Sequence, residues 1–341
     1  MTTKLTMPVA DDLHVHLRQD EMMRRVTPLV RAGGVGRCVV MPNTVPPIST
    51  PADALRYRDA LRALAPDVEF LMTLYLQPGL TPEHIREAVR VGLFGVKCYP
   101  RGVTTNSESG VEDFAQYDPV FAAMEDEGLA LLLHGEMPGS AERDICILNA
   151  EQRFLPEVER LHQRFPRLRI VLEHVTTAEA VACVKALGAT VAATITAHHL
   201  DLTADDWAGR NHNFCKPVAK YPHDRDALRA VVREGHPRFF LGSDSAPHPR
   251  QAKEAACGCA GVFTAPLLLP YLADCFERIG TIDRLPDFCC RFGRQFHGLQ
   301  PLAGEITLER VAQTVPAAYG DIVPYRAGAT LAWQMRGQTE D

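Results

Sequence analysis

The sequence lacks the segments that would hold a protein in a membrane or direct its export. No apolar run approaches the roughly 20 residues that a membrane-spanning helix needs. The first residues, MTTKLTMPVADD, lack the apolar core of a signal peptide. We therefore expect a cytoplasmic protein.

The sequence also has no excess of positive charge. It contains 36 Lys and Arg against 42 Asp and Glu, which gives a net charge of −6. Nucleic acids and anionic membrane surfaces attract basic proteins, so neither is an expected partner.

A cysteine pattern for disulfides or structural zinc is missing as well. In a cytoplasmic protein the ten cysteines are expected to be thiols. Cys257 and Cys259 resemble half of a thiolate zinc site, but such a site usually needs four ligands in paired spacing, and no Cys-x₂-Cys partner is present. Cys289 and Cys290 are adjacent, which is awkward for joint ligation. We interpret the CGC stretch as loop packing.

What the sequence does contain is a regular alternation of apolar strands and helix-like stretches. Eight short β-rich apolar runs occur at 13–17, 37–41, 70–76, 95–99, 130–134, 170–175, 191–196 and 239–242. Helix-like segments between them begin at Thr50-Pro51, at Thr81-Pro82, at Thr177 and at Tyr221-Pro222, where Thr and Pro suit helix starts.

This alternation predicts a parallel sheet, because strands buried on both faces read as continuous apolar runs. Eight units favour an α/β fold of the (β/α)₈ TIM-barrel type, and an open doubly wound sheet is the alternative. We expect one domain over 1–341, with a helical extension from about residue 298.

Polar residues recur where the predicted strands end, which in a barrel is the functional face. His14 and His16 lie two apart, so in a strand both imidazoles share one face. The remaining residues at these ends are Arg18, Asn43, Lys97, His134, His174, Asp244 and His248. Singly, each histidine could be a hydrated or hydrogen-bonded residue. Four histidines and an aspartate at one end of a barrel indicate a binuclear metal site.

Lys97 stands out in the apolar run GVKCYP. An unpaired buried ammonium is costly or loses its proton, and a lysine that reaches solvent from the strand end is the alternative explanation. An ammonium does not bind a cation. Carboxylation by carbon dioxide would convert Lys97 into an anionic ligand with two oxygens that could bridge two metal ions, and we state this as a hypothesis.

Longer motifs add a family resemblance. HVHLR, the lysine of the fourth strand and the later strand-end residues resemble the amidohydrolase superfamily. DLHVHLR, MPNTVPP, KCYPRGVTTNSESGV, LLLHGE, EHVTT, LGSDSAPH and KEAACGCAG resemble, more narrowly, the dihydroorotase family of the monofunctional bacterial type, over residues from about 11 to 266.

The resemblance implies two zinc ions per subunit and a homodimer. His14, His16 and Asp244 would hold the more buried ion, and His134 and His174 the more exposed one. Carboxylated Lys97 and a hydroxide would bridge both. Histidine and carboxylate ligands suit zinc, although cobalt, manganese or iron could occupy the same site.

The implied reaction is the reversible interconversion of N-carbamoyl-L-aspartate and (S)-dihydroorotate in pyrimidine biosynthesis, with Asp244 as the proton carrier. By the same resemblance, the substrate carboxylate would be bound by Arg18, Asn43 and His248. Other implied contacts come from a mobile loop and from the backbone: Thr104, Thr105, Lys216 and Ala260.

Two other functions remain open at this point. Hydantoinases and allantoinases share the metal chemistry, but a neutral ring would not need an arginine clamp. A catalytically dead barrel that serves as a scaffold would lack ligands, whereas all six ligand positions are filled here.

Overall fold

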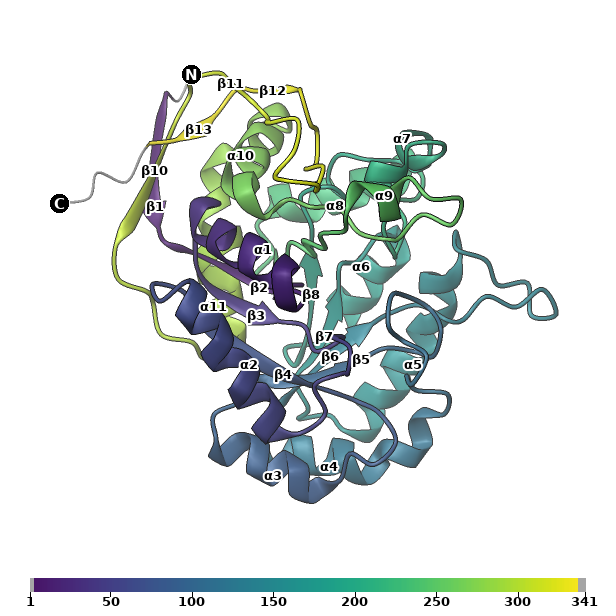
Figure 1. Cartoon of the computed structure of the whole chain (residues 1–341). Helices are drawn as coiled ribbons and strands as arrows, with labels where there is room; N and C mark the ends of the chain where they lie inside the picture. The colour runs from purple at the N-terminus through teal and green to yellow at the C-terminus, as the bar shows by residue number, and fades with distance from the viewer. Residues whose placement is uncertain (1–2, 337–341) are drawn as a thin grey trace.

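The computed structural model describes residues 3–336 and contains a barrel of eight parallel strands (Figure 1). The strands are hydrogen-bonded in chain order: β2 (Ala10–Val15), β3 (Val35–Val40), β4 (Glu69–Tyr75), β5 (Gly95–Cys98), β6 (Ala130–His134), β7 (Ile170–Glu173), β8 (Val191–Ile195) and β9 (Phe239–Leu241). A parallel bridge between Val15 and Ser245, just beyond β9, brings the two ends of the sheet together. All eight predicted strands and the barrel are therefore confirmed.

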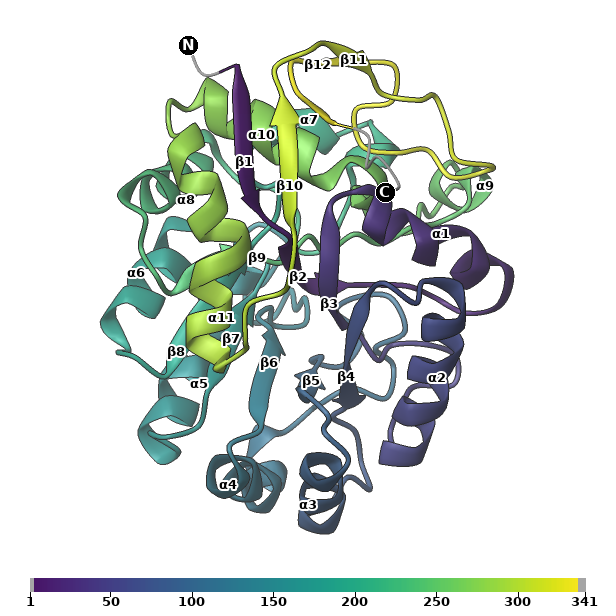
Figure 2. The same ribbon diagram turned by 90° about the vertical axis from the view of Figure 1, so that its left-hand side faces the viewer.

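Helices follow the strands and form an outer layer (Figures 1 and 2). They are α1 (Asp20–Ala32), α2 (Pro51–Leu64), α3 (Pro82–Arg90), α4 (Asp118–Glu127), α5 (Ala150–Arg164), α6 (Ala178–Ala186), α7 (Ala204–Trp207), α8 (Pro222–Glu234), α9 (Arg250–Lys253), α10 (Leu268–Arg278) and α11 (Phe292–His297). The predicted starts of α2, α3 and α6 are confirmed, because the hydroxyls of Thr50, Thr81 and Thr177 accept hydrogen bonds from backbone N–H groups of the first turn.

The apolar core has two parts, one on each side of the strands. A small cluster fills the barrel interior with side chains from most of its strands, among them Leu13, Val39, Leu132 and Phe240, and Phe292 of α11 belongs to it. A larger cluster lies between the strands and the surrounding helices. The strands are buried on both faces as predicted, which fixes the directions of the side chains at their ends.

The expectation of a helical extension after residue 298 is wrong. This part of the chain forms strands instead: β10 (Glu305–Glu309), β11 (Gln313–Thr314), β12 (Thr330–Leu331) and β13 (Gln334–Met335). β10 pairs antiparallel with β1 (Lys4–Pro8), and the two lie side by side in Figure 2.

Its sequence explains why the segment is extended. Ile306 and Leu308 are buried, whereas Glu305 is exposed and Thr307 and Glu309 are half-buried, so apolar and polar residues alternate with the period of two that is typical of a strand. Prolines and glycines that follow closely on one another prevent a long helix there. Within residues 3–336, no helix is both long and apolar enough to cross a membrane.

Candidate active site

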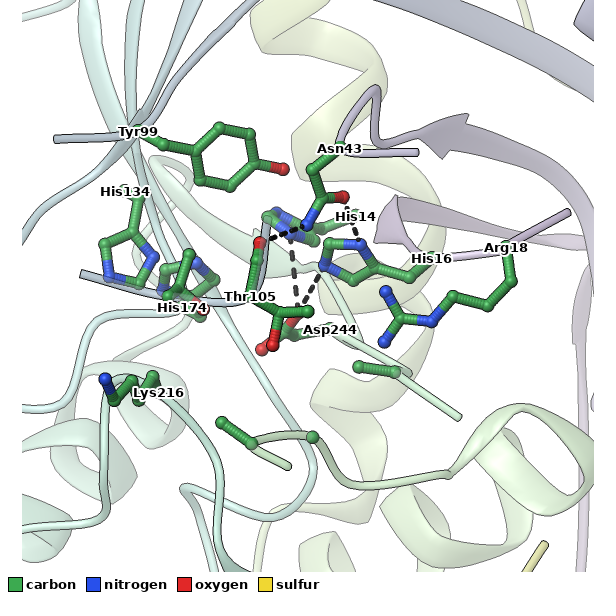
Figure 3. A pocket seen from close by; sticks show the side chains of 14 residues that line it. His14, His16, Arg18, Asn43, Tyr99, Thr105, His134, His174, Lys216 and Asp244 are labelled. Carbon is green, nitrogen blue, oxygen red and sulfur yellow. Dashed lines mark hydrogen bonds and ion pairs between the residues drawn. The ribbon is translucent and has the colours of Figure 1, made fainter. Parts of the chain in front are cut away.

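A pocket of about 330 Å³ lies at the carboxyl ends of the barrel strands (Figure 3). Most of the predicted site residues line it. The full lining is His14, His16, Arg18, Asn43, Tyr99, Thr104, Thr105, His134, His174, Lys216, Asp244, Ala246, Ala260 and Gly261. Of the predicted site residues, only Lys97 and His248 are outside this lining. In Figure 3, His134 and His174 lie on one side of the pocket and Arg18 on the other, with Asp244 between them.

His14 and His16 extend from the end of β2 toward the aspartate. His14 Nε2 lies 3.5 Å and His16 Nε2 lies 3.1 Å from Asp244 Oδ1. The other ring nitrogen of each histidine has its own polar neighbour: His14 Nδ1 lies 2.9 Å from Glu173 Oε2, and His16 Nδ1 lies 2.8 Å from Asn43 Oδ1. Both rings are therefore fixed with one nitrogen directed at Asp244.

His134 and His174 complete a row of imidazoles across the pocket. The ring centroid of His174 lies 4.9 Å from that of His134 and 5.0 Å from that of His14. His134 Nε2 lies 2.9 Å from Glu136 Oε2. In metal sites, a carboxylate commonly contacts the ring nitrogen that does not bind the metal and so orients the histidine.

Lys97 is fully buried in β5, and its Nζ has no hydrogen-bond partner within the described chain. Burial lowers the pKa of Lys97 to about 8, against the opposing effect of the Glu173 and Asp244 carboxylates. A neutral amine is the form that reacts with carbon dioxide, so this environment favours the chemistry expected of Lys97.

The charge states of the cluster suit a metal ion. Burial lowers the pKa of His14, His16, His134 and His174, which keeps the imidazoles in the neutral form that binds metals. Burial alone would raise the pKa of Asp244, but the hydrogen bond with His16 and the proximity of His14, His16 and Lys97 lower it to about 2.

The positions of the donor atoms also suit a metal ion. One donor atom each from His14, His16 and Asp244 lies within 4.8 Å of the others, and Nδ1 of buried His174 has no hydrogen-bond partner within residues 3–336. These donors fit a transition-metal ion.

The opposite side of the pocket holds Arg18. Its Nε donates to the Pro247 carbonyl at 3.1 Å, and its Nη2 lies 3.1 Å from His248 Nε2. His248 Nε2 also lies 3.0 Å from the Ala260 carbonyl oxygen. His248 lies between Arg18 and the loop that carries Ala260, and its Nε2 can accept from Arg18 or donate to the Ala260 carbonyl, depending on the tautomer. A guanidinium thus lies beside the metal-capable cluster.

The loop with Thr104 and Thr105 lies against the pocket. Asn43 Nδ2 donates to the Thr105 carbonyl at 3.1 Å, and Asn106 Nδ2 donates to the Asn43 carbonyl at 2.9 Å. Ser107 Oγ donates to the Thr104 carbonyl at 2.6 Å. The side chain of Asn43 thus contacts both His16 and this loop and links the two.

Several polar residues that support the site were not predicted. Asp12 accepts hydrogen bonds from the Ser243 backbone N–H (2.8 Å), the Ser243 hydroxyl (2.5 Å) and the His14 backbone N–H (3.2 Å), so it joins β2 to the segment that carries Asp244. Lys253 Nζ donates to the carbonyls of Phe214, Cys259 and Gly261 at 2.8, 2.9 and 2.7 Å. It thereby fixes the loop that bears Ala260.

Glu136 and Glu173 are two more residues of this kind, and a sequence signal for them exists. Glu136 follows His134 by two positions in HGE, and Glu173 directly precedes His174 in LEH. By contrast, Cys257 is exposed and Cys259 half-buried, and neither belongs to a three-residue group of metal donors within residues 3–336.

Comparisons with known proteins identify relatives over nearly the full length of the chain. No protein-family model matches the chain. The dihydroorotase of Mycosarcoma maydis is 46% identical over an alignment of length 387 that covers 97% of this chain and 98% of that protein.

Solved structures give the same result. The crystal structure of Saccharomyces cerevisiae dihydroorotase in complex with 5-fluoroorotic acid is similar with a TM-score of 0.95 and 43% identity, covering 98% of this chain and 99% of that one. The L-hydantoinase of Arthrobacter aurescens has a TM-score of 0.85 at 18% identity and covers 98% of this chain and 85% of its own, a likeness in fold alone.

Proposed function

The chain belongs to the dihydroorotase family of the amidohydrolase superfamily, and from this premise we propose that it interconverts N-carbamoyl-L-aspartate and (S)-dihydroorotate. The observation that carries the proposal is the pocket itself. A cluster of four imidazoles and a carboxylate lies on one side of it and a guanidinium on the other. A cyclic amide that also bears a carboxylate needs both.

The metal side of the pocket has six ligands in this proposal. His14, His16 and Asp244 would hold one divalent ion, His134 and His174 would hold the other, and carboxylated Lys97 would supply an anionic ligand to both. Zinc is the proposed metal. When bound, such a pair lowers the pKa of a water molecule and polarises the amide carbonyl. The proposal is supported by the neutral imidazoles, by Lys97 Nζ, which has no hydrogen-bond partner within residues 3–336, and by the proximity of donor atoms from His14, His16 and Asp244.

Asp244 is the proposed proton carrier. Its contacts with His14 and His16 use Oδ1, which leaves Oδ2 for proton transfer. In ring opening the carboxylate takes a proton from the attacking water and delivers it to the leaving amide nitrogen, and in ring closure the proton moves the other way. The low pKa of Asp244 keeps its carboxylate ionised at neutral pH, which is the form that can take up a proton.

The remaining predicted residues bind the substrate in this proposal. Arg18 pairs with the carboxylate outside the reacting bond, since a guanidinium binds a carboxylate through two parallel hydrogen bonds. Asn43 and His248 are the other two residues proposed to bind this carboxylate. The contacts around the ring come from Thr104 and Thr105 and from the backbones of Lys216 and Ala260, and all four residues line the pocket.

An assay of the purified protein with dihydroorotate tests this function. We expect ring opening that is lost after chelation and restored by zinc. Activity on hydantoin with none on dihydroorotate would favour the hydantoinase alternative, and no activity on either with metals bound would favour a scaffold. A homodimer is a further proposal that rests on the family resemblance, and a cytoplasmic location stays a prediction from the sequence.

A further inference from the structure

A second group of metal-binding side chains is buried behind the wall of the pocket. His198 and His199 follow β8, and Cys215 precedes Lys216, which lines the pocket. The exposed fractions of the three side chains are 0%, 1% and 1%. None of them is a ligand of the binuclear centre proposed above, so this inference does not depend on that centre.

The donor atoms of His199, Cys215 and Pro217 lie near the spacing of a tetrahedral site, and a donor atom of His198 lies close by. His199 Nε2 lies 3.5 Å from Cys215 Sγ, and these two atoms lie 3.0 and 3.2 Å from the Pro217 carbonyl oxygen. One donor atom each from His198, His199 and Cys215 lies within 4.8 Å of the others. Bonds of 2.0–2.3 Å around a tetrahedral zinc place neighbouring ligand atoms about 3.3–3.8 Å apart.

His198 has no explanation as a structural residue. Neither of its ring nitrogens has a hydrogen-bond partner among residues 3–336, although the side chain is fully buried. A neutral imidazole carries an N–H on one nitrogen and a lone pair on the other. A buried polar group without a partner costs about 1–3 kcal/mol. A metal ion would use the lone pair that the protein leaves free.

The charges around the cluster are balanced. Cys215 feels the carboxylates of Asp244 and Glu136 and the ammonium groups of Lys253 and Lys220. Burial lowers the pKa of His198 to about 3, so its imidazole is neutral. A divalent ion that displaces the thiol proton of Cys215 would therefore add one net charge to a nearly neutral environment.

We propose that His198, His199 and Cys215 form a third metal site, which binds a borderline-soft divalent ion such as Zn²⁺ with the Pro217 carbonyl as the fourth donor. Binding releases the Cys215 thiol proton to solvent and involves no redox step. The site joins the end of β8 to the Lys216–Pro217 segment. Its role is to fix that part of the pocket wall.

Cobalt substitution of the full-length protein tests the site. Cobalt bound to a thiolate gives an intense charge-transfer band in the near ultraviolet, whereas the histidine and carboxylate ligands of the binuclear centre give none. We expect this band in the wild-type protein. We also expect one cobalt equivalent more than in the Cys215→Ser variant, which should lack the band.

Control variants locate the band. Cys275→Ser and Cys259→Ser should keep it, and His198→Gln should weaken cobalt binding at this site at least tenfold. Circular dichroism verifies that each variant is folded. If Cys215→Ser does not fold, the wild-type spectrum and His198→Gln decide. Absence of the band in the wild type, its persistence in folded Cys215→Ser, its loss in Cys259→Ser, or unchanged affinity in His198→Gln would overturn the proposal.

The test is separate from that of the proposed function. The band reports thiolate ligation whether or not the protein turns over dihydroorotate. Conversely, turnover by a protein that lacks the band would leave the proposed function intact and remove only the third site.

Discussion

Replacement of Arg18 by methionine is the sharpest test of the anion clamp. The guanidinium is held on one edge, because Nε donates to the Pro247 carbonyl and Nη2 contacts His248. Nη1 makes no hydrogen bond within residues 3–336, so the edge formed by Nη1 and Nη2 remains for a carboxylate. Methionine keeps much of the length of the side chain and removes all five donors.

The size of the effect follows from two charge-assisted hydrogen bonds. Each contributes about 1.5–3 kcal/mol, and the lower value applies here because Arg18 is partly exposed. The loss is therefore about 3 kcal/mol, which corresponds to about a 150-fold decrease in kcat/KM at 25 °C. Because the substrate carboxylate is bound equally in the ground state and in the transition state, most of the change should appear in KM.

The assay follows the ultraviolet absorbance of dihydroorotate over a range of concentrations. Arg24→Met is the matched control, because Arg24 lies on α1 with its side chain 60% exposed and should leave both constants unchanged. Arg18→Lys should fall between the two, since it keeps the charge but loses the planar fork. An unchanged KM in folded Arg18→Met with full metal content would refute the clamp.

Three further changes test the metal side and the buried carboxyls. Lys97→Ala should lower the metal content and regain part of its activity with a short carboxylic acid, and metal analysis that finds both ions retained would contradict the bridge. Glu136→Gln should weaken binding of one ion by about 10–100-fold in a chelator competition, because the carboxylate that orients His134 is lost; equal affinity would exclude that role. Glu151 is buried on α5. Burial raises the pKa of Glu151 from 4.5 to about 7, so the folded protein binds more protons than the unfolded chain between these pH values. The free energy of unfolding of the wild type, relative to that of Glu151→Gln, should therefore fall as the pH rises from 4.5 to about 7 and stay level above it. Denaturant titrations at several pH values measure this difference. A difference that does not change with pH would contradict the buried, protonated state.

Local signals made the barrel predictable from the sequence. The strands are apolar runs buried on both faces, and Thr50, Thr81 and Thr177 mark helix starts through contacts within one turn. In a barrel the carboxyl ends of all strands lie at one face. His14 and Asp244 could therefore be expected to lie close together, although 230 positions separate them in the sequence. The last segment was misjudged because β10 is stabilised by β1 at the other end of the chain.

The supporting contacts could not be predicted, because they depend on the three-dimensional packing. Glu173 is next to His174 in the sequence, yet its carboxylate contacts His14 on β2. Lys253 fixes a loop through three carbonyl oxygens, and no side-chain pattern reveals which carbonyls are free. The sequence therefore identifies residues that carry chemistry more readily than the residues that hold them in place.

The backbone of the site shows why such support is needed. Arg18, His174 and Asp244 have φ values of 60°, 42° and 46°, in the left-handed region that L-residues rarely adopt and that costs about 1–3 kcal/mol each. Glycine would relieve this strain, but it would remove the guanidinium, the imidazole or the carboxylate.

Contacts from the barrel and its outer layer hold these conformations instead. The Asp244 N–H donates to the His14 carbonyl at 2.9 Å, the His174 N–H donates to the Thr194 hydroxyl at 2.6 Å, and the Tyr57 hydroxyl of α2 donates to the Arg18 carbonyl. All three partners belong to barrel strands or to α2, so the scaffold helps to hold these three backbone conformations. The fold therefore contributes to the directions of these side chains, and fixed directions of this kind are what electrostatic catalysis requires.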